Sequence, residues 1–183
     1  MAETTFAERR APAADVDEIL RLHREWWESN EQWDIPRMAA VFPAPGDEYL
    51  MFNFNGHPYF NMREKTALWE WYRDQVDQSG GLDVRVMRLE VRGDTAWLAA
   101  EATLQASQRD GEEWTVDGVD TPWIRATEIY HRDRGDGTPE WRMWHTHISP
   151  LAGPDEPRPA FGDSVRSRGL GWVPWNPLPA REA

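Results

Sequence analysis

The chain has 183 residues, among them twelve tryptophans and no cysteine, and its formal net charge at pH 7 is −12. A chain of this length predicts one domain with an extensive hydrophobic core, and the absence of cysteine excludes disulfides, thiolate zinc sites and cysteine nucleophiles. The negative charge argues against a nucleic-acid partner, which would require a basic surface.

No apolar run approaches the length of a membrane-spanning helix, and residues 1–10 lack the basic and apolar segments of a secretory signal. We therefore expect a soluble, cytoplasmic protein without a membrane partner. Tryptophan joins a large apolar surface to a single N–H donor. The many tryptophans are thus typical both of walls around a flat apolar ligand and of a subunit interface.

The first helix is expected to begin at Asp15, after an N-terminal arm of residues 1–14. Glu18 follows Asp15 by three residues, which is the spacing of a capping box. His23 shares the apolar stripe of this helix, and we interpret it as a core histidine held by a hydrogen bond. A short second helix is predicted over residues 36–42, because proline suits the first helical turn.

Residues 49–54 predict a strand, and the turn signal Asn55-Gly56 separates it from a short returning segment. Asn61 and Glu64 repeat the capping-box spacing. They predict a third helix, which Gly80-Gly81 would end.

The rest of the domain is predicted to be β-structure. Residues 82–92 and 95–107 flank a hairpin turn at Gly93-Asp94, and a further strand is expected over residues 119–132. A last strand follows, which alternates at a period of two. One face of this strand is expected to carry Trp141, Met143, His145, His147 and Ser149. The opposite face is expected to carry Arg142, Trp144, Thr146 and Ile148.

The composition changes after Ser149. Residues 150–183 contain seven of the fourteen prolines, and proline resists regular secondary structure. Side chains such as Trp172 and Trp175 are nevertheless too apolar for a free, solvated segment. We therefore expect residues 150–183 to form a C-terminal tail that packs on its own subunit or on a partner subunit.

The order of the elements resembles the nuclear transport factor 2-like, or SnoaL-like, superfamily over residues 15–149. Residues 33–43 resemble its first interhelix stretch, and residues 125–149 resemble its final hairpin. The resemblance implies an α+β domain in which a curled antiparallel sheet forms a cone around N-terminal helices. The superfamily includes isomerases, dehydratases, cyclases, epoxide hydrolases and non-catalytic assembly modules, so the fold does not fix the function. Its enzymes usually need neither a metal nor an organic cofactor, and we expect none here.

His145 and His147 are the leading catalytic candidates. Two imidazoles on one face of a strand, directed into a water-poor hollow, can act as base and acid. The alternative is a histidine that only hydrogen-bonds within the sheet. A metal at this pair would need further ligands from Asp120, Glu101 or His57, and because no tight metal spacing occurs, we predict no metal site.

The remaining candidates come from the loop after the first strand and from the strands opposite the histidines. We expect the catalytic set to be His145, His147, Tyr59, His57 and Glu101. The residues expected to contact substrate are Trp26, Tyr49, Phe52, Trp71, Asp120, Trp123, Arg125 and Tyr130. Arg125 and Asp120 lie on or near the strand that faces the histidines, and we interpret them as a structural ion pair.

Alignment with the ketosteroid isomerase pattern places Phe52 and Asn53 near the carboxylate base of that enzyme, and neither residue takes up a proton. Paired histidines, nearby tyrosines and an aromatic tail look more like scytalone dehydratase, a lyase of this fold that eliminates water. We therefore predict a cofactor-free lyase that uses histidine and tyrosine as acid and base. Its substrate would be a bulky aromatic or polycyclic small molecule, which loses water or is cleaved by a retro-aldol-type reaction.

An isomerase or polyketide-type cyclase of the same fold is one alternative, and a non-catalytic ligand-binding or assembly module is another. Trp144 and Ile148, on the second face of the last strand, are too apolar to face water. They predict a homodimer.

Overall fold

The computed structural model describes residues 12–46, 48–77, 82–104, 107–108 and 123–150, without the side chains of residues 82, 103–104, 107–108, 123 and 150. The chain divides into two units, Met1–Pro150 and Leu151–Ala183. The second unit lies wholly outside the described residues, so the packing predicted for the C-terminal tail stays a prediction. The fold below is that of the first unit.

The described part of this unit is an α+β structure. Its helices are α1 (Ala13–Glu31), α2 (Ile35–Ala39) and α3 (Met62–Gln75). Its strands are β1 (Leu50–Phe52), β2 (Pro58–Tyr59), β3 (Val76–Asp77), β4 (Leu82–Arg92), β5 (Thr95–Leu104), β6 (Ser107–Gln108), β7 (Trp123–Arg132) and β8 (Trp141–Pro150). No helix in this part of the chain combines the length and apolarity that a membrane crossing requires.

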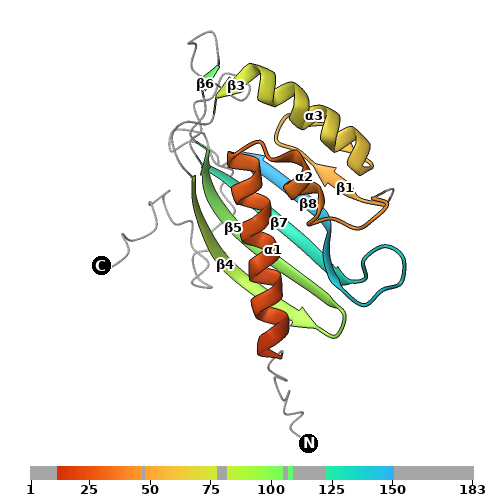
Figure 1. The fold of residues 1–183 in the computed structure, drawn as a ribbon. Coiled ribbons are helices and arrows are strands. Elements are labelled where there is room, and N and C mark those ends of the chain that lie inside the picture. The colour runs from red at the N-terminus through yellow and green to blue at the C-terminus, as the bar shows by residue number, and fades with distance from the viewer. Residues whose placement is uncertain (1–11, 47, 78–81, 105–106, 109–122, 151–183) are drawn as a thin grey trace, which may run out of the picture. The chain divides into compact units, whose positions relative to one another are not determined.

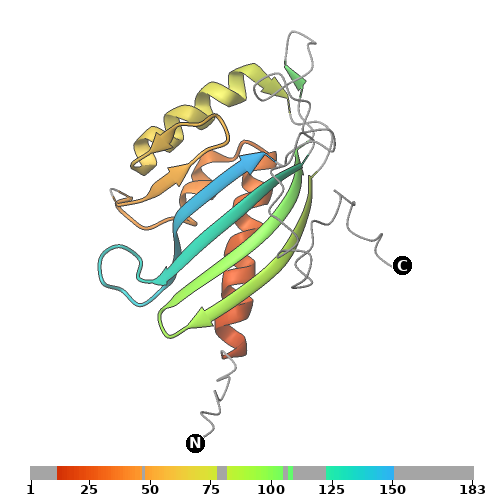
Figure 2. The same ribbon diagram turned by 180° about the vertical axis from the view of Figure 1, so that it is seen from behind.

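The large sheet has the strand order β2-β1-β8-β7-β5-β4, and β3 pairs with β6 in a separate two-stranded sheet. The four long strands, β4, β5, β7 and β8, are antiparallel to one another, as predicted. The short β1 runs parallel to β8, which makes the sheet mixed instead of purely antiparallel. Figures 1 and 2 show that α1 crosses one face of the sheet, which curls around it.

The hydrophobic core fills the space between α1 and this inner face of the sheet. In β5, the buried side chains alternate at a period of two, which is the spacing of a strand with one covered face: Ala96, Leu98, Ala100 and Ala102. Ile19, Leu22 and Trp26 of α1 belong to the same core. Complete burial of an aliphatic side chain stabilises the fold by about 1.5–3 kcal/mol, so these contacts fix the helix on the sheet.

The predicted cap of α3 is confirmed. The side chain of Asn61 accepts a hydrogen bond from the Glu64 backbone N–H at 2.9 Å, and the Glu64 carboxylate accepts one from the Phe60 N–H at 2.9 Å. The helix ends at Gln75, however, well before Gly80-Gly81, because Val76 is extended and enters β3.

The predicted start of α1 at Asp15 is wrong by two residues. The helix begins at Ala13, and its N-cap residue Pro12 has no side chain that could cap it. The Asp15 carboxylate instead accepts hydrogen bonds from Arg132 on β7 at 2.6 Å and from Trp141 on β8 at 3.1 Å. The hydrogen bond from Arg132 is the main cause that lowers the pKa of Asp15. A residue with the sequence pattern of a cap therefore joins the helix to the sheet.

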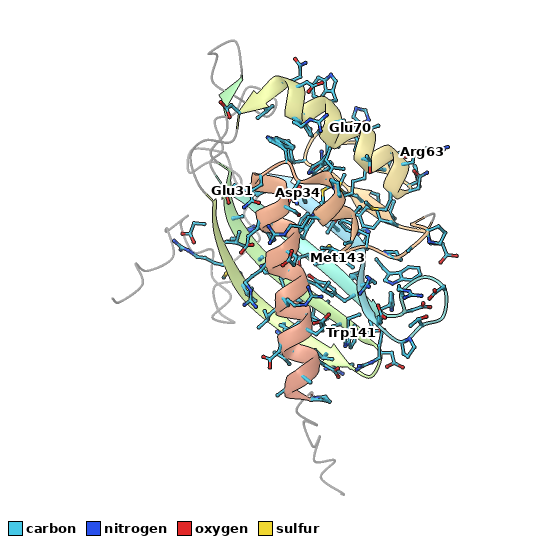
Figure 3. The ribbon with its side chains drawn as sticks, in the orientation of Figure 1. Glu31, Asp34, Arg63, Glu70, Trp141 and Met143 are labelled. Carbon is cyan, nitrogen blue, oxygen red and sulfur yellow. The ribbon has the colours of Figure 1, made fainter. Side chains whose placement is uncertain are left out.

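A β-bulge in β8 changes which side chains face the core. Ile129 of β7 pairs with His145, but the next residue, Tyr130, pairs with Met143, so Trp144 is an extra residue in β8. Before the bulge, Trp141 and Met143 are buried as predicted; Figure 3 shows both beside α1.

Beyond the bulge the alternation is reversed. Thr146 and Ile148 are buried in the core, whereas His145 is half-buried and His147 is exposed. The prediction that both histidines share the inner face with Met143 is therefore wrong.

Candidate active site

A carboxylate lies in the middle of the protein interior, on the inner face of β7. Glu128 is fully buried, and it follows Ile124 and Ala126 in the alternation of that face. A buried carboxylate costs several kcal/mol unless hydrogen bonds compensate for its lost hydration. Three side chains supply these bonds, so the identity of the donors decides what the carboxylate can do.

The donors to Glu128 come from α1 and from β7 itself. Nδ1 of His23 lies 2.9 Å and 3.0 Å from the two carboxylate oxygens, and Nε1 of Trp27 lies 3.0 Å from Oε1. The Tyr130 hydroxyl donates to Oε2 at 2.5 Å. The hydrogen bond expected for a core histidine at position 23 is thus confirmed, and its partner is a charged group.

The carboxylate determines the tautomer of His23. A carboxylate only accepts hydrogen bonds, so Nδ1 must carry the hydrogen, and the lone pair of the neutral ring lies on Nε2. No described residue forms a hydrogen bond with Nε2. An imidazole held in this way can take up a proton at Nε2 while the carboxylate stabilises the resulting cation.

Two tyrosines beside this pair remain protonated. Burial raises the pKa of Tyr130 well above its ordinary value, and the Glu128 charge raises it further. Burial also strongly raises the pKa of Tyr49, whose hydroxyl is bonded to that of Thr146. Thr146 is the residue of β8 that pairs with Glu128. The interior therefore combines a base, His23, with phenols that can donate a proton.

A lysine lies in the same interior, within a cage of aromatic rings. Lys65 on α3 is fully buried, and its Nζ lies 3.4 Å from the sulfur of Met51. The distances from Nζ to the ring centroids are 3.8 Å for Trp69, 4.8 Å for Phe42, 5.4 Å for Trp26 and 5.5 Å for Tyr49. No carboxylate of the described residues pairs with this amine, and burial lowers the pKa of Lys65 well below its ordinary value.

The predicted histidine pair lies on the outer face of the sheet. His145 bonds through Nδ1 to the Leu50 carbonyl at 2.9 Å, and desolvation lowers its pKa. The Phe52 ring contacts both imidazoles edge-on, at centroid distances of 5.4 Å to His145 and 5.7 Å to His147. The structure thus brings three predicted site residues together, on the face opposite His23. Their catalytic and substrate-binding roles stay predictions.

Glu101 and Arg125 also occupy the outer face. They pair across β5 and β7, and the Arg125 Nε lies 3.1 Å from the Glu101 carboxylate. Arg125 thus has a structural ion pair, but its partner is Glu101; Asp120, the carboxylate expected beside it, lies outside the described residues. The guanidinium is largely exposed, so water screens the interaction.

The other predicted residues are scattered. His57 is exposed, and Tyr59 is half-buried with its hydroxyl accepting a hydrogen bond from Asn55 at 2.8 Å. Trp71 points outward from α3 and is 58% exposed, because Trp69 occupies the buried face of the helix in its place. Asp120 and the side chain of Trp123 lie outside the described residues.

Of the predicted residues, Trp26, Tyr49 and Tyr130 are the ones found in the interior site. Among the site residues absent from the predicted set are the three that can carry a charge, His23, Glu128 and Lys65. Two features of the sequence could have marked these residues as candidates. Glu128 alternates with apolar residues on the covered face of its strand, where a carboxylate needs hydrogen-bond donors. Lys65 is the only lysine among the 20 lysine and arginine residues of the chain.

A cleft of about 410 Å³ lies elsewhere, beside the β4–β5 turn and the bulge. Its lining residues are Asp94, Thr95, His131, Arg132, Asp133 and Trp144. Arg132 is held by Asp94 at 2.9 Å and by Asp15, and His131 bonds to Thr95 at 3.2 Å. Because these polar groups already have partners, the cleft is a weaker candidate than the interior site. Within the described residues, no three His, Asp or Glu side chains are grouped as metal ligands.

Comparison with solved structures identifies the fold. A nuclear transport factor 2-like superfamily protein from Salmonella enterica serovar Typhimurium has 16% identity and a TM-score of 0.63, with 83% of this chain and 99% of that one covered. A ketosteroid isomerase-like protein from Erwinia carotovora atroseptica has 12% identity and a TM-score of 0.61, covering 78% of this chain and all of that one. A candidate dehydratase of the NTF2-like family from Streptomyces avermitilis has 17% identity and a TM-score of 0.57, with coverages of 78% and 100%. Identities this low show the fold alone.

None of the curated proteins compared with the chain matches it. The sequence model of the SnoaL-like domain matches residues 19–153, which is well over half of the chain and includes most of α1, all of α2 and α3, and every strand of the large sheet. The protein therefore belongs to the SnoaL-like domain family, and its helices and curled mixed sheet have the fold of the NTF2-like protein from Salmonella.

Proposed function

We propose that the protein is a lyase that acts by acid–base catalysis on a bulky aromatic small molecule, with His23 as the base. The observation that carries the proposal is the hydrogen bond between Nδ1 of His23 and the buried carboxylate of Glu128. Acid–base catalysis by a positioned side chain typically contributes about 10²–10⁴-fold to a rate. The family includes dehydratases, isomerases and cyclases, and proton transfer is common to these reactions.

In the proposed elimination, Nε2 of His23 takes a proton from a carbon of the substrate. The electron pair of that C–H bond forms a C=C bond, and the hydroxyl group on the adjacent carbon leaves. Tyr49 donates the proton that turns this hydroxyl into water, and the proton on His23 then returns to Tyr49 through the solvent. Burial raises the pKa of Tyr49, so the phenol keeps its proton at neutral pH until the leaving hydroxyl, which becomes a stronger base as the C–O bond breaks, takes it.

A retro-aldol-type cleavage uses the same groups. His23 takes the proton of a substrate hydroxyl, a carbonyl forms as the adjacent C–C bond breaks, and Tyr49 protonates the carbon that leaves. An isomerase or cyclase differs only in where the proton is returned. The proposed aromatic substrate is supported by the aromatic walls that Trp26, Trp27 and Tyr130 give to the interior.

The burial of the cluster supports a second candidate, a ligand-binding or assembly module without catalysis. His23 is 4% exposed, and Glu128 and Tyr130 are fully buried and bonded to one another. A satisfied network of this kind also occurs where it only specifies the packing of a core. In that case His23 would have only a structural role, and its replacement would change no reaction rate.

The test compares the inner histidine with the outer pair. Aromatic compounds that quench the tryptophan fluorescence would first be selected, and mass spectrometry would identify which of them is converted. His23→Gln should then lower turnover about 10²–10⁴-fold with binding retained. The matched variants His145→Gln and His147→Gln should keep the wild-type rate.

Two results would decide against the proposed base. Turnover that His23→Gln leaves unchanged would support the module, provided that circular dichroism shows the same fold. Turnover that is lost in His145→Gln or His147→Gln instead would place the chemistry at the outer pair that the sequence suggested.

A homodimer is also proposed. Ile148 belongs to the core and Trp144 donates to the Asp133 carbonyl at 2.9 Å, so these two residues support it less than expected. The outer face nevertheless exposes Phe52, which is 42% accessible, beside the two histidines. Sedimentation at micromolar concentration tests the proposal, which a monomer would contradict.

A further inference from the structure

Lys65 is the only lysine of the chain, and every other basic position is an arginine. The two residue types differ in one property that matters inside a protein. Arginine keeps its proton under all conditions in proteins, whereas a buried lysine can lose it and become a neutral amine. At its fully buried basic position the chain therefore has Lys65, the residue type that can lose its proton.

The surroundings of Lys65 favour the neutral amine. Four aromatic rings and the Met51 thioether enclose Nζ, and a thioether is only a weak hydrogen-bond acceptor. Glu128, the fully buried carboxylate of the described residues, is already occupied by three other donors. Burial accordingly lowers the pKa of the Lys65 amine, whose lone pair is then free to act as a nucleophile.

A second polar atom of the same enclosure also lacks a partner. The ring of Trp26 is one wall of the cage around Lys65, and its indole N–H is buried without any hydrogen-bond acceptor in the described part of the chain. Unpartnered buried donors are rare and call for an explanation. An acceptor oxygen brought by a ligand would satisfy this N–H, and a carbonyl group offers such an oxygen next to an electrophilic carbon.

We propose that Lys65 captures an aromatic aldehyde or ketone as an imine. The amine nitrogen attacks the carbonyl carbon while the oxygen accepts a hydrogen bond from the Trp26 indole. A proton moves from nitrogen to that oxygen, and the resulting carbinolamine loses its hydroxyl with the second amine proton as water. The product is a C=N bond, and no oxidant or reductant is consumed. This activity goes beyond the proposed lyase function and stands without it.

The ligand reaches Lys65 by a movement of α3. In the structure the rings close over the amine, and the indole N–H of Trp69 on α3 bonds to the Asn30 side chain on α1. The helix packs mainly on the short elements α2, β2 and β3, not on the long strands. A movement of α3 would break the Trp69–Asn30 hydrogen bond and the contacts with α2, β2 and β3, while the four long strands keep their pairing.

The test uses benzaldehyde as the probe and sodium cyanoborohydride to reduce the imine to a stable secondary amine. The full chain would be treated at pH 7, and peptide mapping would separate Lys65 from the N-terminal amine, which is the chain's other primary amine. Each unit by which a pKa lies below 10.5 raises the neutral fraction at pH 7 about tenfold. Lys65 should therefore be labelled faster in the folded chain than in guanidinium.

Lys65→Met and Lys65→Arg should lose the internal label and keep the one at the N-terminus. Labelling of Lys65 that is no faster in the folded chain, while the N-terminus reacts in both states, would overturn the proposal. His23→Gln should be labelled like the wild type, so a failure of the proposed lyase function would not be mistaken for a failure of this one.

A measurement on the unmodified protein gives an independent test. Growth on lysine labelled with ¹⁵N at Nζ produces a single side-chain signal, because the chain has one lysine. That signal should titrate well below pH 10.5, and benzaldehyde should shift it at pH 7. A midpoint at the ordinary value of 10.5 would mean that the amine is charged at neutral pH, which would overturn the proposal.

Discussion

Two imidazoles bond through Nδ1, one on α1 against the inner face of the sheet and one on the outer face, and the partners of these bonds differ. On the inner face, His23 donates to the carboxylate of Glu128; on the outer face, His145 bonds to the carbonyl of Leu50. A carboxylate stabilises the positive charge that a proton would bring, whereas a carbonyl opposes desolvation only weakly. Proton-transfer chemistry is thus better supported at the buried histidine than at the accessible pair.

The largest expected effect is the loss of stability when the carboxylate on the inner face of the sheet is removed. Glu128→Ala removes the acceptor of three buried donors and should cost about 3–5 kcal/mol in the free energy of unfolding. The outer carboxylate Glu101, paired with an exposed arginine, gives the matched variant Glu101→Ala, which should cost less than about 1 kcal/mol. Urea unfolding of both variants measures the difference. Equal losses would mean that the inner network is no more demanding than a surface ion pair.

The next effect is a gain of stability. Lys65→Met replaces a buried amine by an apolar side chain of similar length, and should stabilise the protein at pH 7 on the order of 1–4 kcal/mol. The pKa of Lys65 is lower in the folded chain than the 10.5 of the unfolded chain. Between these two values the unfolded state binds more protons, so wild-type stability rises with pH.

The advantage of Lys65→Met should therefore shrink as the pH approaches 10.5. Thermal unfolding of the two proteins across this range gives the difference directly, since all other groups titrate alike in both. An advantage that is constant with pH would show that the amine has the same pKa in both states.

A smaller effect is expected for the hydroxyl pair of the interior. Tyr49→Phe leaves the buried Thr146 hydroxyl without its partner and should cost about 1–3 kcal/mol. Adding Thr146→Val removes the unpaired group, and the double variant should recover part of that loss. Denaturation of the two single variants and the double variant completes a cycle, and strictly additive losses would indicate that the two hydroxyls do not interact.

Much of the fold follows from the sequence because its signals are local. Asn61 with Glu64 predicts the start of α3, and the turn at Gly93-Asp94 predicts the β4–β5 hairpin, since each depends on neighbouring residues only. The sequence patterns at Asp15 and Trp71 lead to wrong predictions, because contacts with residues distant in the sequence determine the environment of both side chains. Asp15 is drawn to Arg132 and Trp141, and the buried face of α3 is rotated so that Trp69 lies inside.

The site was harder to predict for a related reason. Strict alternation places His145 beside Met143, but one extra residue, Trp144, reverses the faces beyond it. Nothing in the sequence of β8 alone marks a bulge there, because it depends on the pairing with β7. The bond between His23 and Glu128 joins residues 105 positions apart, so it becomes visible only when α1 lies on the sheet.

The smallest effect concerns the outer histidine. Desolvation lowers the pKa of His145 below its ordinary value of 6.5, so the unfolded chain binds more protons between the two values. Wild-type stability should fall slightly as the pH drops through 6.5, and His145→Gln should lose this dependence. Because the ring is only half-buried, the difference should stay below about 1 kcal/mol. Urea midpoints at pH 5 and pH 8 measure it, and a variant with the full wild-type dependence would exclude His145 as its source.

The bulge at Trp144 also bears on how relatives of this fold can diverge. Removing one codon at that position would invert the remainder of the strand, carrying the two imidazoles inward and Thr146 and Ile148 out to solvent. The gain or loss of a single residue can therefore change which side chains of the strand line the interior, while every other residue of the strand stays the same. Homologues aligned without a gap at this point would share residues that face in opposite directions.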